Sequence, residues 1–283
     1  MKKVAIIGPG LLGGSIAMAL RRKSPKTKVF IWARREEAVE SVRKAGIADL
    51  VSSDLSVVAS GADLVVLCVP IGAMPGLALA LVSIISPETL VTDVGSVKGP
   101  VVEALTPVFT QRGHFIGSHP MAGSERAGLE AAQSTLFEKA VCILTPTKQT
   151  PEVDILRAFW ELLGCNVRIL SPEAHDETVG LVSHLPHLMA ATLVNLVSRT
   201  NPGAMEFCGN GFRDTTRIAS GPAEMWAEIL LSNRDAVKSF TQAMIENLEE
   251  VVTLLDRRDL DGVQALLTNA NRQRDNIPRG AGT

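Results

Sequence analysis

The sequence predicts an α/β protein in which a doubly wound, Rossmann-type nucleotide-binding domain is followed by an all-α domain. Three observations predict this fold. The chain begins with an apolar run, Lys3–Ile7, that ends in a glycine cluster and continues as a helical pattern. Up to residue 170, apolar runs of strand length alternate with helical patterns, which is typical of a parallel sheet with helical crossovers. Long helical patterns dominate after that, so we expect one domain over 1–170 and a second over 171–283.

The composition excludes several classes of protein. With 283 residues, 46% of them hydrophobic and 20% charged, the chain is long enough for about two globular domains. The net charge of -2 offers no basic surface for nucleic acid or an anionic membrane. We expect no membrane-spanning run and no cleavable leader, which predicts a cytoplasmic protein. Tyrosine is absent, which excludes nicotinamide enzymes with a tyrosine as proton donor.

The glycine cluster after the first strand has the spacing of a dinucleotide fingerprint. Gly8 permits the backbone angles of the turn, Gly10 lets the main chain approach a pyrophosphate, and Gly13 lets the helix lie close to the strand. The helix that follows offers free N–H groups and a positive dipole end to the phosphates. The cofactor contacts expected in this loop are Gly8, Pro9, Gly10, Leu11, Leu12 and Gly13.

The end of the second strand, Lys28–Trp32, indicates which dinucleotide is bound. NAD-type sites carry an acidic residue there to bind the ribose hydroxyls. This chain has Ala33 followed by Arg34 and Arg35, so two guanidinium groups are available to pair with a 2′-phosphate. We therefore expect NADP to be preferred and NAD to remain possible; the alternative is that both arginines belong to a solvated helix start.

The later strands end in residues that face the same crevice. We expect Val69 and Pro70, at the end of an apolar strand, to contact the cofactor. The next strand leads into Ser96 and Lys98. A histidine, His119, follows at the end of a further strand and is expected to accept a proton from a substrate. The remaining elements expected here are helices at 36–46, 73–85, 101–111 and 152–163 and strands at 48–51, 63–69, 89–94, 137–145 and 166–170.

Two polar clusters interrupt the helical half, where helices are expected at 172–198, 205–220, 223–255 and 259–271. His184 and His187 are three residues apart, so they share a helix face beside a kink at Pro186. The pair has too few ligands for a metal, so no metal site is predicted. In the second cluster, one of Arg213 and Arg217 can bind a substrate carboxylate with Asp214 and Trp226 nearby; the alternative is an interhelical salt bridge.

Five motifs, in order, resemble those of the prephenate and arogenate (cyclohexadienyl) dehydrogenases, and they span almost the whole chain: Gly8–Gly13, Asp93–Gly99, Gly117–Glu125, Ser183–His187 and Gly211–Ala219. The resemblance implies oxidative decarboxylation of prephenate, arogenate or both, with hydride transfer to NAD(P), in tyrosine biosynthesis. It also implies that the helical half forms an intertwined homodimer.

The resemblance assigns roles to individual residues. His119 resembles the catalytic histidine, and Ser96 resembles a serine that orients it and approaches the nicotinamide. Substrate binding falls to Arg217, His184 and His187, with Arg213 and Trp226 near them. Glu125 and Asp214 correspond to acidic members of an ionic network that can act as a gate, and Lys98 is expected to be structural or to face the cofactor.

Several alternatives stay open. Another two-domain dehydrogenase, of the 3-hydroxyacid or pyrroline-carboxylate type, shares the predicted architecture but does not explain the motifs around His119 and Arg217. A non-catalytic NADP-binding module would bind the nucleotide without turnover. The choice between prephenate and arogenate, the strictness of the NADP preference and feedback inhibition by tyrosine are not decided by the sequence.

Overall fold

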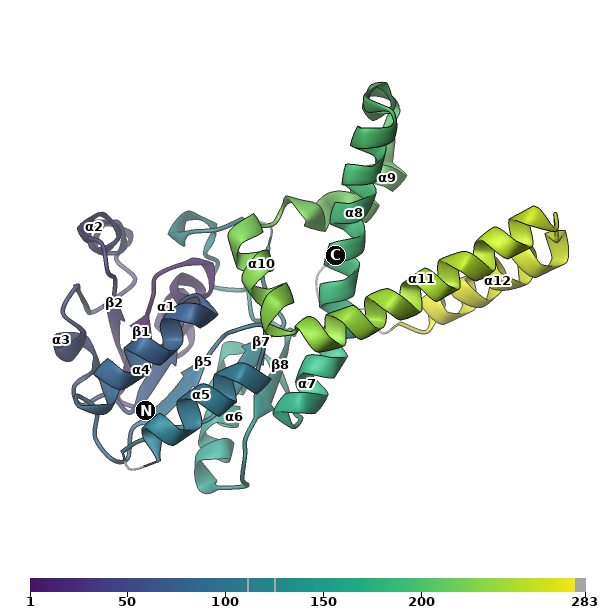
Figure 1. The fold of residues 1–283 in the computed structure, drawn as a ribbon. Coiled ribbons are helices and arrows are strands. Elements are labelled where there is room, and N and C mark those ends of the chain that lie inside the picture. Colours follow the sequence, from purple (N-terminus) through teal and green to yellow (C-terminus); the bar gives the residue numbers. More distant parts are fainter. Residues whose placement is uncertain (111, 125, 278–283) are drawn as a thin grey trace.

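A computed structural model describes residues 1–110, 112–124 and 126–277 and confirms the predicted fold class. Figure 1 shows the α/β domain with a helical half that projects away from it in two directions. The parallel sheet has the strand order β3-β2-β1-β4-β5-β6, so the direction of winding reverses between β1 and β4. In such sheets the carboxyl ends of the strands at this reversal form the ligand crevice. The strands are β1 Lys3–Ile7, β2 Lys28–Trp32, β3 Leu50–Ser52, β4 Leu64–Leu67, β5 Leu90–Asp93 and β6 His114–Phe115.

Helices bury both faces of this sheet. Alternate side chains of β1 enter two separate cores, with Ile6 in one and Ile7 in the other. The first core includes Trp160 and the second includes Met74, so each face is closed by apolar helix residues. Burial on both faces explains why these strands read as continuous apolar runs. The helices of the domain are α1 Leu11–Lys23, α2 Glu36–Ala45, α3 Leu55–Ala59, α4 Met74–Val82, α5 Gly99–Phe109 and α6 Pro151–Leu163.

A second sheet, of three strands, was not predicted. It has the order β7-β8-β9, formed by β7 Gly117–Pro120, β8 Val141–Thr145 and β9 Asn166–Ile169. Strand β7 runs antiparallel to β8, and His119 pairs with Ile143. His119 was expected at the end of a strand, and it lies in β7 next to the last residue, Pro120. Strand pairing with a segment this distant supplies hydrogen bonds that the local glycine and proline content does not reveal.

The helical half differs from the predicted helices at two places. In place of the single helix expected at 205–220, the chain forms the short helix α9, Asn210–Thr216, with a 3₁₀ turn on each side. The helix expected at 223–255 is broken at Asn233, whose φ of -111° and ψ of 30° leave the helical region. The other elements are α7 Pro172–Val179, a π-helical turn Gly180–His184, α8 Leu185–Thr200, α10 Ala223–Ser232, α11 Arg234–Asp256 and α12 Leu260–Asp275.

The run from α7 through α8 corrects one expectation about membranes. These elements form one helix, Pro172–Thr200, that is long and apolar enough to cross a membrane by length and composition, although no apolar run of that kind was expected. A third of its most apolar window is buried inside the chain. The same run carries four buried polar residues, which lie against the rest of the protein: His175, Asp176, His184 and His187.

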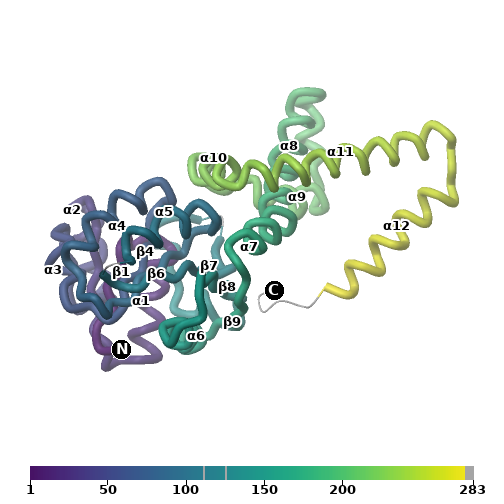
Figure 2. The backbone as a smooth tube through the Cα atoms, turned by 60° about the horizontal axis from the view of Figure 1, so that its bottom comes forward, coloured from purple at the N-terminus to yellow at the C-terminus, as the bar shows by residue number. Residues whose placement is uncertain are grey.

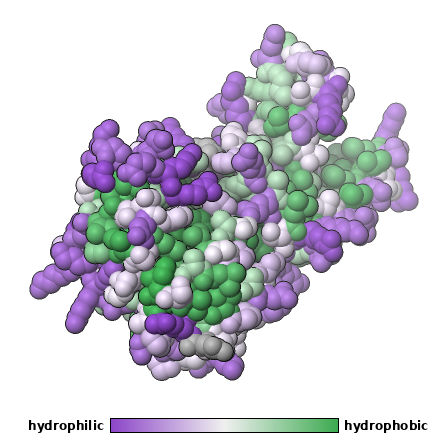
Figure 3. All heavy atoms as spheres, turned by 60° about the vertical axis from the view of Figure 1, so that its left-hand side comes forward, coloured by the Kyte–Doolittle hydropathy of each residue, from purple (hydrophilic) through white to green (hydrophobic). Residues whose placement is uncertain are grey.

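Helices α11 and α12 form an antiparallel arm that extends beyond the rest of the chain (Figure 2). Among the described residues of α11 only Val237 is buried, and none of α12 is. Hydrophobic atoms are visible on the surface of the projecting half (Figure 3). The exposed apolar residues of this arm include Leu248, Val252, Leu255, Leu260 and Leu267.

Candidate functional site

The glycine loop has the geometry of a dinucleotide site. Gly8 has a φ of 109°, and a Cβ there would lie 2.5 Å from the carbonyl oxygen of Cys68. A Cβ at Gly13 would overlap the carbonyl oxygen of Gly8. At Gly10, by contrast, a Cβ would meet no described atom within 4 Å. Gly8 and Gly13 thus allow close packing within the protein, whereas Gly10 leaves open space in front of the loop.

The helix start behind this space is suited to an anion. Helix α1 has Gly10 as its N-cap, without a capping side chain and without an acidic residue in the first turn. Its first N–H groups therefore keep their capacity to bind phosphate oxygens. Val69, after β4, lies against Gly8, so the two strand ends meet where the sheet reverses. These residues fit a dinucleotide, with the pyrophosphate at the start of α1.

Arg34 and Arg35 follow β2 at the same edge of the sheet. Ala33 is buried, both arginines are exposed, and Arg35 is the N-cap of α2. Within the described part of the chain, neither guanidinium group has a carboxylate partner. Two unpaired cations at this position can bind a phosphate monoester.

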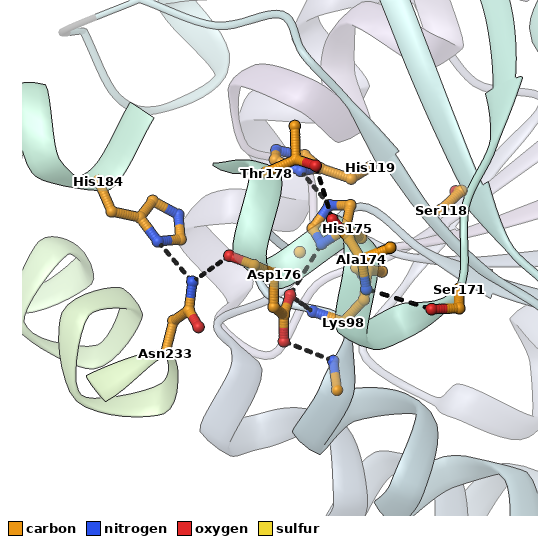
Figure 4. A network of polar contacts seen from close by, with 12 residues as sticks. Lys98, Ser118, His119, Ser171, Ala174, His175, Asp176, Thr178, His184 and Asn233 are labelled. Atoms are coloured by element: carbon orange, nitrogen blue, oxygen red, sulfur yellow. Dashed lines mark hydrogen bonds and ion pairs between the residues drawn. The ribbon is translucent and has the colours of Figure 1, made fainter. Parts of the chain in front are cut away.

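His119 is buried and belongs to a chain of three polar side chains (Figure 4). Its Nδ1 lies 2.8 Å from Nε2 of His175, and Nδ1 of His175 lies 2.8 Å from Oδ1 of Asp176. The Asp176 carboxylate also accepts hydrogen bonds of 2.7 Å from the backbone N–H groups of Lys98 and Gly99, at the start of α5. Burial, followed by the nearby His175, holds the pKa of His119 well below its usual range, so the ring is neutral at neutral pH.

A buried ion pair lies next to β7. Lys98 and Asp93 are both fully buried, and the Lys98 ammonium pairs with Oδ2 of Asp93. Asp93 also accepts a hydrogen bond from the N–H of Gly95, at 2.7 Å, and its carbonyl accepts one from the Ser118 hydroxyl at 2.6 Å. The Lys98 ammonium therefore pairs with the residue of β5 that binds Ser118 of the strand carrying His119, which agrees with a structural role for Lys98.

His184 and His187 lie close together, as expected from their spacing, and Trp226 of α10 covers them. The rings of His187 and Trp226 are stacked, with centroids 3.5 Å apart. Gly221 makes room, since a Cβ there would lie 2.5 Å from Nε1 of Trp226. Nε2 of His184 and Nδ1 of His187 are buried without a hydrogen-bond partner among the described residues. Such atoms are costly unless a ligand satisfies them.

Asn233 holds the other side of His184. Its Nδ2 donates to the carbonyl of Asp176 at 2.7 Å and lies 3.1 Å from Nδ1 of His184. Burial lowers the pKa of His184 to about 4, although Asp176 and the backbone of Ser96 act in the opposite direction. His184 is therefore neutral, and the Ser96 loop lies beside it.

The structure brings some of the predicted residues together and leaves others apart. Ser96 follows β5 as expected, but no hydrogen bond joins its side chain to His119 in the described chain; His175 holds that ring instead. Arg213 and Asp214 lie exposed on α9, while Arg217 begins the 3₁₀ turn that packs on α8.

Glu125, which is predicted to belong to an ionic network, lies outside the described residues. Within the described ranges, no group of three or more potential ligands can hold a metal ion.

Three functional candidates escaped the sequence analysis: His175, Asp176 and Asn233. A signal for the first two was present, because a His-Asp pair stands near the start of an otherwise apolar helical run. Nothing local marks Asn233, whose partners lie more than 40 residues away: the separations are 57 and 49 positions.

Comparison with known proteins gives consistent matches along the chain. A family model described as prephenate dehydrogenase, nucleotide-binding domain, matches residues 16–169, and one described as prephenate dehydrogenase, dimerization domain, matches residues 171–269. The prephenate dehydrogenase of Bacillus subtilis is 34% identical over 281 residues, covering 97% of this chain and 76% of that protein.

Solved structures agree with these matches. The prephenate dehydrogenase of A. aeolicus, in complex with hydroxyphenyl propionate and NAD+, has a TM-score of 0.91 and 33% identity, over 98% of each chain. The arogenate dehydrogenase of Synechocystis has a TM-score of 0.83 and 31% identity, over 96% of this chain and 99% of that one.

Proposed function

The chain belongs to the prephenate dehydrogenase family, and from this premise we propose how its own residues carry out the reaction and which cofactor it prefers. The reaction is the oxidative decarboxylation of prephenate or arogenate in tyrosine biosynthesis, with a nicotinamide cofactor. When bound, the nicotinamide accepts the hydride that leaves the ring carbon. The observation that carries the residue assignment is the buried, neutral His119 bound to His175, together with the buried His184 and His187, each with a nitrogen that has no hydrogen-bond partner among the described residues.

His119 is the group that receives the hydroxyl proton. The substrate hydroxyl must lose its proton as the hydride leaves the same carbon, and carbon dioxide departs as the ring becomes aromatic. A neutral imidazole can accept that hydrogen, and the lowered pKa of His119 keeps it neutral. Ser96, on the loop beside His184, approaches the same hydroxyl and the nicotinamide.

The helical half supplies the substrate-binding groups. Arg217 binds a substrate carboxylate, and the unsatisfied nitrogens of His184 and His187 support hydrogen bonds from the same side. Trp226 forms the apolar wall over His187. Arg213 adds positive charge on α9, and Asp214 acts with Glu125 as a gate.

NADP is the preferred cofactor in this proposal. Arg34 and Arg35 are exposed and unpaired with carboxylates in the described chain, and Ala33 takes the place of the acidic residue that favours NAD. The cofactor contacts are Gly8, Pro9, Gly10, Leu11, Leu12, Gly13, Val69 and Pro70. The division into 1–170 and 171–283, a homodimer through the apolar arm and a cytoplasmic location complete the proposal.

The test is reduced-nicotinamide formation by the purified enzyme, with prephenate and arogenate each assayed against NADP and NAD. We expect turnover with at least one substrate and a higher kcat/KM with NADP. Higher kcat/KM with NAD would refute the cofactor assignment. No turnover in any of the four combinations, with the nucleotide shown to bind, would refute the activity and favour the alternative of a non-catalytic NADP-binding module.

A further inference from the structure

The polar chain that ends on His119 determines which of its ring nitrogens carries a hydrogen. The carboxylate of Asp176 only accepts hydrogen bonds, and two of those it accepts come from backbone N–H groups at the start of α5. Nδ1 of His175, 2.8 Å from that carboxylate, must therefore be the protonated nitrogen of its ring. Because burial lowers the pKa of His175, its ring is neutral, so its Nε2 has no hydrogen and can only accept.

The same logic passes to the next ring. Nε2 of His175 lies 2.8 Å from Nδ1 of His119, so Nδ1 of His119 must donate. His119 is neutral and carries only one ring hydrogen, which leaves its Nε2 unprotonated. A base that accepts a hydroxyl hydrogen needs this unprotonated nitrogen. Figure 4 shows His175 between His119 and Asp176, and both His175 and Asp176 belong to α7.

We propose that Asp176 and His175 are positioning residues that hold His119 in its Nδ1–H form, so that its Nε2 is the acceptor for the substrate hydroxyl. The inference rests on the proposed function of His119 and deepens it. In the reaction, the hydroxyl proton is transferred to Nε2 of His119, and the Nδ1–H of the resulting cation donates a stronger hydrogen bond to His175. The proton stays on His119, and no bond of His175 or Asp176 is broken.

His119 and the two residues that position it belong to different halves of the chain. His119 belongs to the nucleotide-binding half, whereas α7 begins the helical half. Asp176 is bound to α5 on one side and, through its carbonyl, to Asn233 on the other. The helical half therefore orients the base of the neighbouring domain.

The first measurement needs no variant. The imidazole ¹⁵N resonances of histidine-labelled wild-type enzyme report which nitrogen is protonated, and the His119→Asn variant assigns the His119 signals. We expect neutral His119 with hydrogen on Nδ1. Hydrogen on Nε2 would overturn the proposal, whether or not the enzyme proves active. Inactivity of the wild type with both substrates would refute only the proposed function, so the two failures are distinguishable.

The second measurement uses Asp176→Asn with Glu177→Gln as a matched control, since Glu177 is the exposed neighbour on the same helix. The amide has one oxygen for the three N–H donors that the carboxylate binds, those of Lys98, Gly99 and His175. Where its NH2 group faces His175, both rings reverse and the His119 hydrogen lies on Nε2, and the imidazole ¹⁵N resonances of the variant report this reversal. We expect kcat to fall by about 10²–10⁴-fold, as for a base held in the wrong tautomer, with KM changed less than about threefold. Wild-type kcat in a folded Asp176→Asn variant whose ¹⁵N resonances place the His119 hydrogen on Nε2 would overturn the proposal.

A third variant covers the case in which Asp176→Asn does not fold. In His175→Gln, the amide oxygen can accept the hydrogen of Nδ1 of His119 without any help from Asp176. We expect this variant to keep kcat within about tenfold of the wild type and His175→Leu to lose about 10²-fold or more. Equal losses in both variants, with unchanged thermal stability, would overturn the proposal.

Discussion

Gly10→Ala distinguishes an effect on folding stability from an effect on cofactor binding. The φ of -75° and ψ of -163° at Gly10 suit an alanine, and its Cβ would meet no described atom within 4 Å. The free energy of unfolding should therefore stay within about 0.5 kcal/mol of the wild type or rise slightly. If the main chain approaches a pyrophosphate here, the methyl group occupies ligand space. We expect the Kd for NADP to rise at least tenfold, which corresponds to about 1.4 kcal/mol.

The assays are isothermal titration calorimetry with NADP and urea denaturation without it. Gly13→Ala is the contrasting variant, because its Cβ would overlap the carbonyl oxygen of Gly8 inside the protein. It should lose about 1–3 kcal/mol of stability, the usual effect of overpacking. A stable Gly10→Ala variant with wild-type affinity for NADP would refute the placement of the pyrophosphate at this loop.

Four further predictions follow from the site. His119→Asn should bind NADP normally and lose kcat by about 10²–10⁴-fold, the contribution of a general base, in steady-state assays; unchanged turnover would remove it from the mechanism. Arg217→Ala should mainly raise KM for the substrate, and a large fall in kcat at constant KM would contradict a binding role. Replacing Arg34 and Arg35 by alanine should raise KM for NADP and leave KM for NAD nearly unchanged, whereas equal effects on both would exclude contact with the 2′-phosphate. The pKa of His184 is about 4 in the folded protein, so the unfolded chain binds more protons below pH 6.5. The free energy of unfolding should therefore fall by up to about 3 kcal/mol between pH 7 and pH 4. His184→Gln should reduce this pH dependence in urea titrations, and an unchanged pH dependence would contradict the assignment.

The sequence alone predicted the parts of the molecule that depend on neighbouring residues. The fingerprint from Gly8 to Gly13 was recognisable because strand, turn and helix follow within one short segment, where Gly8 has a positive φ and Gly13 packs against the carbonyl of Gly8. The pairing of His184 with His187 was equally local, since helix geometry places residues three apart on one face. The fold class follows from the same kind of periodicity, which is a property of short windows.

Only the tertiary structure decided which groups surround His119. Its partner His175 is 56 residues away, and Asp176 reaches α5 across 78 positions. The antiparallel pairing of β7 with β8 and the break at Asn233 likewise depend on contacts between distant segments. Periodicity describes which face of an element is apolar, but hydrogen-bond partners are chosen by packing, because a buried polar group must bond to whatever donor or acceptor the fold brings beside it.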